Sequence, residues 1–347
     1  MAKRKVLFIH HGLGEDFKIP LGSFPFDFSC SILSDNDEIL KNIKKNHYKL
    51  ILCGLKTFKA LPDTIKSNPK FIVVPKIFFT VDNNVISSEK ESLKLGAVDY
   101  ISYPFDPDLL KRKISMALNL ESYRNGVESI LKEQFKKIEQ LNSGIIMMLA
   151  NIIESRDGTT GEHVKRVSYY VKALAMKLKE SGVYEKELSN TLIEKLIDAA
   201  ALHDIGKITV PDSVLKKTGK LSEEEFEMMK NHSKEGGLII KNNLKFLQEA
   251  DFVKVAADIA SYHHENWDGT GYPFGKKETD IPLVARITAV ADVFDALVSK
   301  RLYKEAMSVD DALALMAQDE GTKFEPVILK VFLSMGDELK KLIKELS

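Results

Sequence analysis

Two histidine-rich segments in the second half of the chain carry residues suited to metal chemistry. The run HHENWDGTGYP begins with His263 and His264, and sixty residues upstream the run HDIGK contains His203 and Asp204. Five of the eight histidines fall within about a third of the chain: His163, His203, His232, His263 and His264. Imidazole and carboxylate groups are ligands of transition metals, and six or more of them exceed what one ion needs. The pattern predicts a two-metal hydrolase that acts on a phosphodiester.

The pattern around HDIGK indicates how the first of these residues are positioned. An apolar stripe over residues 192–200 runs into His203 and Asp204, which we therefore expect at the end of a buried helix. Gly206 then allows a turn, which brings Lys207 close to whatever His203 and Asp204 bind. Adjacent His and Asp side chains serve two metals if the carboxylate bridges them, so Asp204 is the bridging candidate.

Three further candidates lie on other predicted helices. His232 is expected to end a helix that begins with a capping box formed by Ser222 and Glu225. His163 lies on the apolar side of its helix, and Asp292 stands among apolar residues, where a carboxylate is costly unless it is paired or binds a metal. A single histidine of this kind is more often a hydrogen-bonded core residue than a ligand. Four helices that each direct a His or Asp side chain toward the interior together favour a metal centre.

The segments HDIGK, MKNHSKEG, HHENWDGTGYP and ARITAVADVFDAL resemble, in this order, an HD-GYP domain, a branch of the HD phosphohydrolase superfamily. The resemblance covers about residues 145–335. Members are cyclic-di-GMP phosphodiesterases with iron- or manganese-type clusters in an α-helical bundle. The resemblance therefore implies hydrolysis of this dinucleotide to pGpG, and onward to GMP, through a water activated by two metals. The implied metal ligands are His163, His203, Asp204, His232, His263, His264 and Asp292.

The same resemblance implies further roles at the site. Lys207 matches the lysine that contacts substrate phosphate and is expected to act in catalysis with Asp204. The signature tripeptide is matched by Gly271, Tyr272 and Pro273. The segment RLYK retains two basic residues that are expected to meet phosphate, Arg301 and Lys304, although Leu302 replaces the family's proline.

The chain departs from some members at the position of a third-metal ligand. A glutamate four residues before the first histidine would supply that ligand, and Thr159 stands there. We therefore expect two ions, either iron or manganese, with zinc not excluded. Glu162 and Asp157 lie nearby and could instead supply a ligand for a third ion. The WDGTGYP loop is either a rigid turn that displays Tyr272 for packing or a loop that borders the substrate or a partner protein. Trp267 either stacks on a base of the substrate or packs within the protein.

The first part of the chain, residues 1–118, alternates apolar runs with helical patterns. This alternation predicts a doubly wound α/β domain with a parallel sheet. Helices are expected at 37–45 and 87–95. Strands are expected at 6–9, 50–53, 71–74, 77–81 and 100–102.

The runs KVLFI, YKLILCGL and GAVDYISYPFDPDLL resemble the first, third and last strands of a response-regulator receiver domain. The residues that a receiver uses for phosphorylation are missing. His10 and His11 replace its acidic pair, Gly54 replaces its phospho-accepting aspartate and Tyr103 its lysine, so that only Thr80 fits. The resemblance implies a degenerate receiver that cannot be phosphorylated in the usual way; His10 and His11 could instead form a ligand site.

A heptad pattern follows, in a linker helix expected over residues 119–143 and continuing toward 153. It predicts either a parallel homodimer through a coiled coil or one long helix lying on its own chain. Gly126 and Gly144 are expected to weaken the helix and mark bends. The remaining residues, 144–347, are helix-patterned throughout and predict an all-α bundle. The heptad positions are Val127, Leu131, Gln134, Ile138, Leu141, Ile145, Met148 and Ile152.

Composition limits the setting and the partners. The 50 basic and 50 acidic residues balance, so charge gives no case for bulk nucleic acid or an anionic membrane as partner. Two scattered cysteines, no signal peptide and no long apolar run predict a cytoplasmic protein. Two other functions stay open: a signalling module that binds the dinucleotide or a protein partner without useful turnover, and hydrolysis of another cyclic dinucleotide such as cyclic GMP-AMP.

Overall fold

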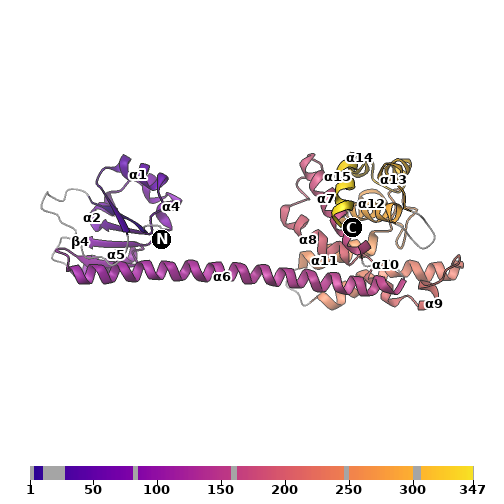
Figure 1. Cartoon of the computed structure of the whole chain (residues 1–347), viewed down its shortest axis with the longest axis horizontal. Coiled ribbons are helices and arrows are strands. Elements are labelled where there is room, and N and C mark those ends of the chain that lie inside the picture. The colour runs from indigo at the N-terminus through magenta and orange to yellow at the C-terminus, as the bar shows by residue number, and fades with distance from the viewer. Residues whose placement is uncertain are drawn as a thin grey trace. The chain divides into compact units, whose positions relative to one another are not determined.

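The computed structural model (Figure 1) describes residues 4–10, 28–80, 85–157, 162–245, 250–299 and 306–346. The chain divides into two compact units, residues 1–136 and residues 137–347. Within the described ranges, no helix combines the length and the apolar character that crossing a membrane requires.

The first unit contains a five-stranded parallel sheet in the order β2-β1-β3-β4-β5. Four of the strands lie where the sequence predicts them, and β2, with the sequence FSCSIL, was not expected. The α/β prediction is confirmed. The strands are β1 (Arg4–Ile9), β2 (Phe28–Leu33), β3 (Leu50–Gly54), β4 (Lys76–Thr80) and β5 (Asp99–Ser102).

Alternating side chains on β1 enter two separate cores, because successive residues of a strand point to opposite faces of the sheet. Leu7 and Ile9 pack in one cluster with α1 (Asn36–Lys45), and Val6 and Phe8 pack in another with the first turns of α6 (Pro107–Glu154). Both faces of the sheet are thus covered by helices, and Figure 1 shows α1 on one side of the strands and α6 on the other.

The predicted strand at 71–74 is wrong. Residues 71 and 72 lie in helix α4 (Pro69–Ile72), and residues 73 and 74 follow it. A proline occupies the first turn of this helix, and the Asn68 side chain accepts a hydrogen bond from the Lys70 backbone N–H at 3.0 Å. This cap favours a helix over the extended chain that the apolar run suggested. The other short helices of the unit are α2 (Leu55–Ala60), α3 (Asp63–Lys66) and α5 (Val85–Lys94).

The residues at the positions that a receiver domain uses for phosphorylation lie at the ends of the strands. Gly54 ends β3, Thr80 ends β4 and Tyr103 follows β5. His10 directly follows β1, whereas His11 lies outside the described residues.

Helix α6 is one continuous element of 48 residues and passes through Gly126 and Gly144. It carries apolar side chains on two faces. Ala150 and Ile153 are buried against the bundle, and Ile146 packs on its core. The heptad side chains face outward instead, with Val127 at 53% and Leu141 at 65% exposure.

The second unit is helical, and its described residues contain no strand, which confirms the all-α prediction. Its core joins apolar residues of six long helices and several short ones. The long helices are α7 (Glu162–Glu180), α8 (Asn190–Ala201), α10 (Glu223–Leu244), α11 (Ala250–Tyr262), α12 (Leu283–Val298) and α15 (Gly336–Leu346); the shorter ones are α9 (Asp212–Leu215), α13 (Val309–Met316) and α14 (Pro326–Leu333), with 3-10 helices η2 (Ser155–Asp157), η3 (Ile205–Thr209), η4 (Glu278–Asp280) and η5 (Ala317–Asp319).

Candidate metal centre

Separate helices bring the seven predicted ligands together inside the second unit. His163 lies in the first turn of α7, His203 and Asp204 lie in the turn between α8 and η3, and Asp292 lies on α12. His263 and His264 directly follow α11. The side chains form adjoining groups that could hold metal ions: Asp204, His232, His263 and His264; and His163, His203 and Asp292.

His232 lies in the middle of α10 rather than at its end. The expected capping box of Ser222 and Glu225 is present, and it starts a helix that continues to Leu244. The prediction that His232 ends this helix is therefore wrong, while its inward direction agrees with the structure, because the side chain is 3% exposed.

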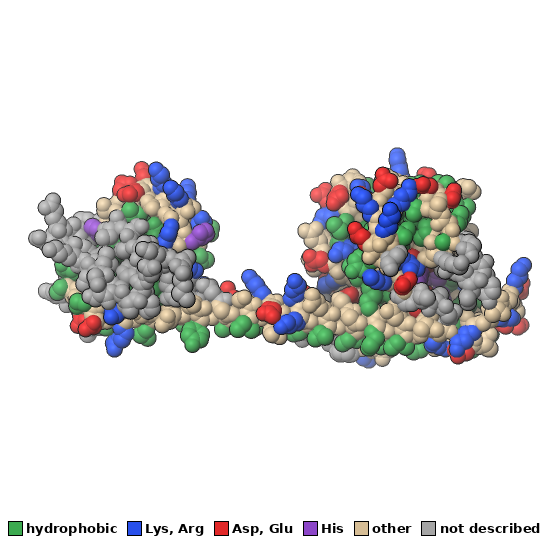
Figure 2. Space-filling view, in the orientation of Figure 1, with side chains coloured by type: hydrophobic (Ala, Val, Ile, Leu, Met, Phe, Trp, Pro, Cys, Tyr) green, Lys and Arg blue, Asp and Glu red, His purple; other side chains and the backbone are tan. Residues whose placement is uncertain are grey.

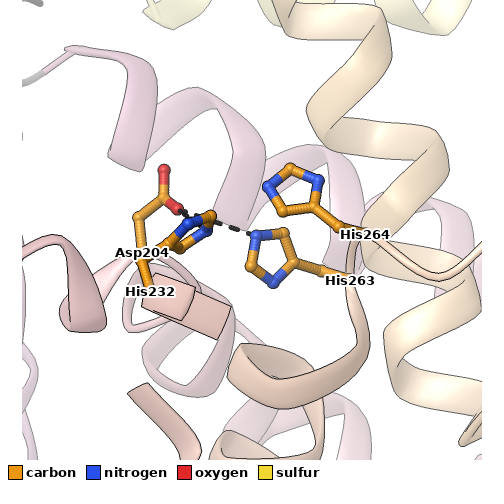
Figure 3. Close-up of side chains that lie close together, drawn as sticks. All are labelled: Asp204, His232, His263 and His264. Atoms are coloured by element: carbon orange, nitrogen blue, oxygen red, sulfur yellow. Dashed lines mark ion pairs between the residues drawn. The ribbon is translucent and has the colours of Figure 1, made fainter. Parts of the chain in front are cut away.

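The Asp204 carboxylate lies between the two groups. Its Oδ1 atom is 3.1 Å from Nε2 of His232 and 3.6 Å from Nε2 of His263. Dashed lines mark both contacts in Figure 3. Its Oδ2 atom is 3.3 Å from Nε2 of His203 and 2.8 Å from Nζ of Lys207. One oxygen thus faces each group, which is the arrangement that a bridging carboxylate requires.

The second group surrounds His163. Its Nε2 atom lies 3.6 Å from Oδ1 of Asp292, and its ring centroid lies 5.5 Å from that of His203. The His203 ring lies in turn 5.2 Å from the ring of His263, so the two groups are continuous.

Each of four imidazoles uses its Nδ1 atom to contact a group outside the cluster. The Nδ1 atoms of His203, His232 and His263 face backbone carbonyls of Ala200, Met229 and Ile259, at 2.9, 2.7 and 3.1 Å, and that of His163 faces Asp295 at 2.7 Å. Such contacts fix the tautomer that leaves Nε2 free to ligate, and they are typical of metal-binding histidines.

Buried atoms at the centre lack hydrogen bonds. The Nε2 atoms of His203 and His263 and the Oδ1 atom of Asp204 are inaccessible to solvent and make no hydrogen bond of good geometry. Unsatisfied buried polar atoms are costly, and these three lie in the two adjoining ligand groups, where cations fit as the missing partners. The donor set therefore fits metal ions.

The charges of the cluster are mutually dependent. Burial alone would raise the pKa of Asp204, but the neighbouring Lys207 and His203 hold that pKa well below its usual range. Burial would lower the pKa of His203, but Asp204 beside it raises this pKa to about 9. Burial lowers the pKa of His263, and burial together with the neighbouring imidazoles lowers that of His264 well below its usual value. The site thus holds the ionised carboxylate of Asp204 beside one imidazole whose pKa is raised and two imidazoles whose pKa values are lowered.

Two glycines allow the backbone of the site to pack closely. A Cβ atom on Gly206 would lie 1.9 Å from the His232 carbonyl oxygen and 2.5 Å from the Gly236 nitrogen. A Cβ atom on Gly271 would lie 2.2 Å from the Asn266 nitrogen. Any larger residue at either position would push apart segments that carry predicted ligands.

The loop containing Gly271, Tyr272 and Pro273 lies directly beside the cluster. The Tyr272 backbone N–H donates to the His264 carbonyl oxygen at 3.1 Å, and the two rings lie 4.8 Å apart. Glu265, which is buried, accepts hydrogen bonds from the backbone N–H groups of Phe274 and Lys276 at 2.7 and 3.0 Å. The loop is therefore anchored at Tyr272 and at two positions that follow it.

Trp267 packs against a cation within the protein. The Arg286 guanidinium lies 5.7 Å from its ring centroid, and the Trp267 backbone pairs with Lys323 and Glu278. These contacts favour the packing role over stacking on a base.

Two acidic residues beside the ligands are not in the predicted set of site residues. Asp295, only 1% exposed, accepts hydrogen bonds from Arg166 and faces His163. Glu154, also 1% exposed in its side chain, lies in one further potential ligand group with His163 and Asp204. Asp295 had a signal in the sequence, since it stands one turn beyond Asp292 on the same helical face.

The residues considered for a third ion are placed only in part. The Glu162 side chain is 63% exposed and pairs with Arg166, so it does not face the cluster. Thr159 lies outside the described residues, and so does the side chain of Asp157. The predicted phosphate contacts Arg301 and Lys304 also lie outside them.

An all-helical unit with a cluster of inward histidines and aspartates defines a metal-site domain, and comparison gives its family. The HD domain model matches residues 147–328. This chain belongs to the HD domain family.

Three relatives illustrate the likeness. "Probable cyclic di-GMP phosphodiesterase" of Vibrio cholerae is 39% identical over 78% of this chain and 63% of its own length. "Cyclic di-GMP phosphodiesterase" of Thermotoga maritima is 31% identical over 87% of this chain and 81% of its own length. "3'3'-cGAMP-specific phosphodiesterase 2" of Vibrio cholerae is 31% identical over 81% of this chain and 51% of its own length. The chain thus spans less than two thirds of the first and third of these relatives.

Proposed function

We propose that this chain is a metal-dependent phosphodiesterase that hydrolyses cyclic di-GMP to pGpG and onward to GMP. One observation carries the proposal: the imidazole Nε2 atoms of His203, His232 and His263, from three separate segments, converge on the two oxygens of Asp204, while their Nδ1 atoms are fixed by backbone carbonyls outside the cluster. The names of the relatives support the choice of substrate.

The two ligand groups would each hold one divalent ion, with Asp204 between them. His232, His263 and His264 would hold one ion, and His163, His203 and Asp292 would hold the other. Two such ions, when bound, would lower the pKa of a shared water and supply charge to the phosphate oxygens. A set rich in imidazole, with carboxylates, suits iron or manganese and also accommodates zinc.

The side chains of this chain orient the substrate. Lys207, whose Nζ atom lies 2.8 Å from Asp204, places a positive charge at the edge of the cluster, where it would offset charge that develops on the phosphate. Tyr272 lies against His264 and would form a border of the substrate site, with Gly271 and Pro273 fixing its loop. Arg301 and Lys304 would contribute further phosphate contacts.

Substitution of Asp204 tests the activity. We expect purified, metal-loaded Asp204→Ala to lose hydrolysis of cyclic di-GMP, whereas Asp337→Ala, at an exposed position in α15, retains it. Mass spectrometry of anaerobically purified protein should find two ions per chain. Wild-type protein that holds two ions but shows no turnover would favour the alternative, a signalling module that binds the dinucleotide or a protein partner without useful turnover. An Asp204→Ala variant with full signalling output would favour the same alternative. One ion or fewer per chain would contradict the two-metal assignment.

Cyclic GMP-AMP is a second candidate substrate. It is favoured by the relative that is named for 3'3'-cGAMP and matches 81% of this chain. Parallel turnover assays with both dinucleotides, at equal concentration, decide between them by the ratio of kcat/KM.

We propose further that the N-terminal unit is a receiver-like domain without phospho-transfer chemistry. Support comes from the parallel order β2-β1-β3-β4-β5, and from Gly54 and Thr80 at the ends of β3 and β4. Incubation with acetyl phosphate should leave the protein unmodified in its intact mass. Formation of an acyl phosphate would contradict this proposal.

The exposed face of α6 supports a parallel homodimer through this helix. Its heptad side chains are apolar except Gln134, and hydrophobic side chains are visible along the helix in Figure 2. Large exposed apolar surfaces mark interaction sites, and the 3.5-residue repeat fits a second copy of the same helix. Light scattering at micromolar concentration should give a dimer mass, and Leu141→Glu should give a monomer. A wild-type monomer would contradict the proposal.

A further inference from the structure

The end of helix α6 contacts the predicted phosphate-binding lysine. Glu154, the last residue of α6, has a buried side chain whose Oε1 atom accepts a hydrogen bond from Lys207 Nζ at 3.1 Å. Asp204 Oδ2 lies 2.8 Å from the same Nζ atom. The ammonium group therefore lies between two carboxylates, and the Lys207 side chain is only 16% exposed.

Two residues later, Arg156 contacts the backbone that carries Lys207. Its guanidinium donates hydrogen bonds to the carbonyl oxygens of Lys207 and Ile208 at 3.1 Å each, to that of Val210 at 3.2 Å, and to Asp212 Oδ1 at 2.7 Å. One side chain thus ties together residues 207–212.

The turn that carries Lys207 needs such support. The 3-10 helix η3 spans five residues, and short 3-10 segments have weak hydrogen-bond geometry and leave carbonyl oxygens at the C-terminal end without helical partners. The Lys207 carbonyl accepts the Val210 N–H at 3.1 Å and also the Arg156 guanidinium. Arg156 therefore stabilises the backbone of the turn, and Glu154 fixes the direction of the side chain.

We propose that Glu154 and Arg156 are positioning residues that hold Lys207 for its contact with the substrate phosphate; this inference rests on the proposed function. Neither residue needs to touch the substrate. Because Glu154 ends the 48-residue helix α6 and Arg156 lies in the 3-10 helix η2 that directly follows it, a shift in the last turn of α6 moves both supports of Lys207 at once.

A double-mutant cycle on Lys207 tests the proposal. We expect Glu154→Ala and Arg156→Ala each to lower kcat about tenfold or more, with KM nearly unchanged, because each removes a charge-assisted contact. Arg156→Lys should recover part of the loss. In a Lys207→Ala background, adding either substitution should change kcat little, since residues that act through one group are not additive. Full additivity would overturn the proposal.

Matched controls and metal content separate positioning from other roles. Glu139→Ala and Arg112→Ala, at exposed positions on the same helix, should leave kcat and KM unchanged. Every variant should retain two ions per chain. Loss of an ion from Glu154→Ala would make Glu154 a metal ligand, consistent with its nearness to His163 and Asp204, and would overturn its positioning role.

A second readout needs no turnover. Acetylation of Lys207 by acetic anhydride, followed by mass spectrometry, reports how freely its amine reacts. We expect the rate to rise about tenfold in Glu154→Ala and to rise also in Arg156→Ala, because these contacts hold the amine in a side chain that is only 16% exposed and so restrict the access of the reagent. An unchanged rate in both variants would overturn the proposal even if the wild-type protein hydrolyses the dinucleotide. A wild-type protein without turnover, but with this labelling pattern, would count against the proposed function alone.

Discussion

Gly206→Ala is the substitution for which the structure gives the clearest expected magnitude. A methyl group at this position would lie 1.9 Å from the carbonyl oxygen of His232, whereas real Cβ atoms essentially never approach a heavy atom closer than 3.0 Å. Because the obstructing atoms belong to the backbone of α10, no side chain can rotate away. The segment carrying Asp204 and Lys207 must therefore move from α10 by about 1 Å.

A displacement of this size has consequences for both stability and activity. Overpacking of this kind costs about 1–3 kcal/mol, which for a unit of this size corresponds to a fall in Tm of roughly 2–12 °C. The 3.1 Å approach of Asp204 to His232 is lost at the same time. Since a misplacement of about 1 Å can reduce a rate about 100-fold, we expect kcat/KM for cyclic di-GMP to fall by about that factor.

The assay compares Gly206→Ala with a matched glycine nearby. Gly219→Ala meets no heavy atom within 4 Å and should behave as the wild type. Thermal unfolding followed by circular dichroism, metal content and turnover are measured on all three proteins. Wild-type Tm and turnover in Gly206→Ala would refute the reasoning, as would an equal loss in Gly219→Ala.

Three other predictions concern the surroundings of the cluster. Asp295→Asn should weaken metal affinity about 10–100-fold in competition with a chelator, because Asp295 orients His163; unchanged affinity would show that this contact is dispensable. Glu265→Gln should lower the free energy of local opening at Phe274 and Lys276 by about 1.5–3 kcal/mol, measured by amide exchange, and identical exchange rates would refute the anchoring role. His203, whose pKa in the metal-free site is raised to about 9, is protonated at neutral pH, so ion binding should release a proton and apparent affinity should increase as pH rises toward 9. Calorimetry in two buffers with different ionisation enthalpies measures this release, and a heat independent of the buffer would contradict it.

The fold class of both units was readable from the sequence because it follows from local periodicity. Strands β1 and β3 are short apolar runs, and the helices of the second unit repeat apolar residues at three- and four-residue steps. The errors arose where local signals compete. The apolar run at 71–74 met a proline and an asparagine cap, and α10 continued past His232 because nothing in its sequence ends it there.

The sequence by itself determined which imidazoles and carboxylates were candidates for the site, since residue type and motif order are properties of the chain alone. The tertiary structure decided which acids and bases support them: Asp295 reaches His163 across 132 residues, and Arg156 reaches the turn of Lys207 across 51. Glu154 and Arg156 have no distinguishing local pattern, because a charged residue that pairs inside a protein has the same sequence appearance as one that meets water. Only the packing of α6, α7 and α12 around the cluster removes these side chains from solvent and gives each a partner.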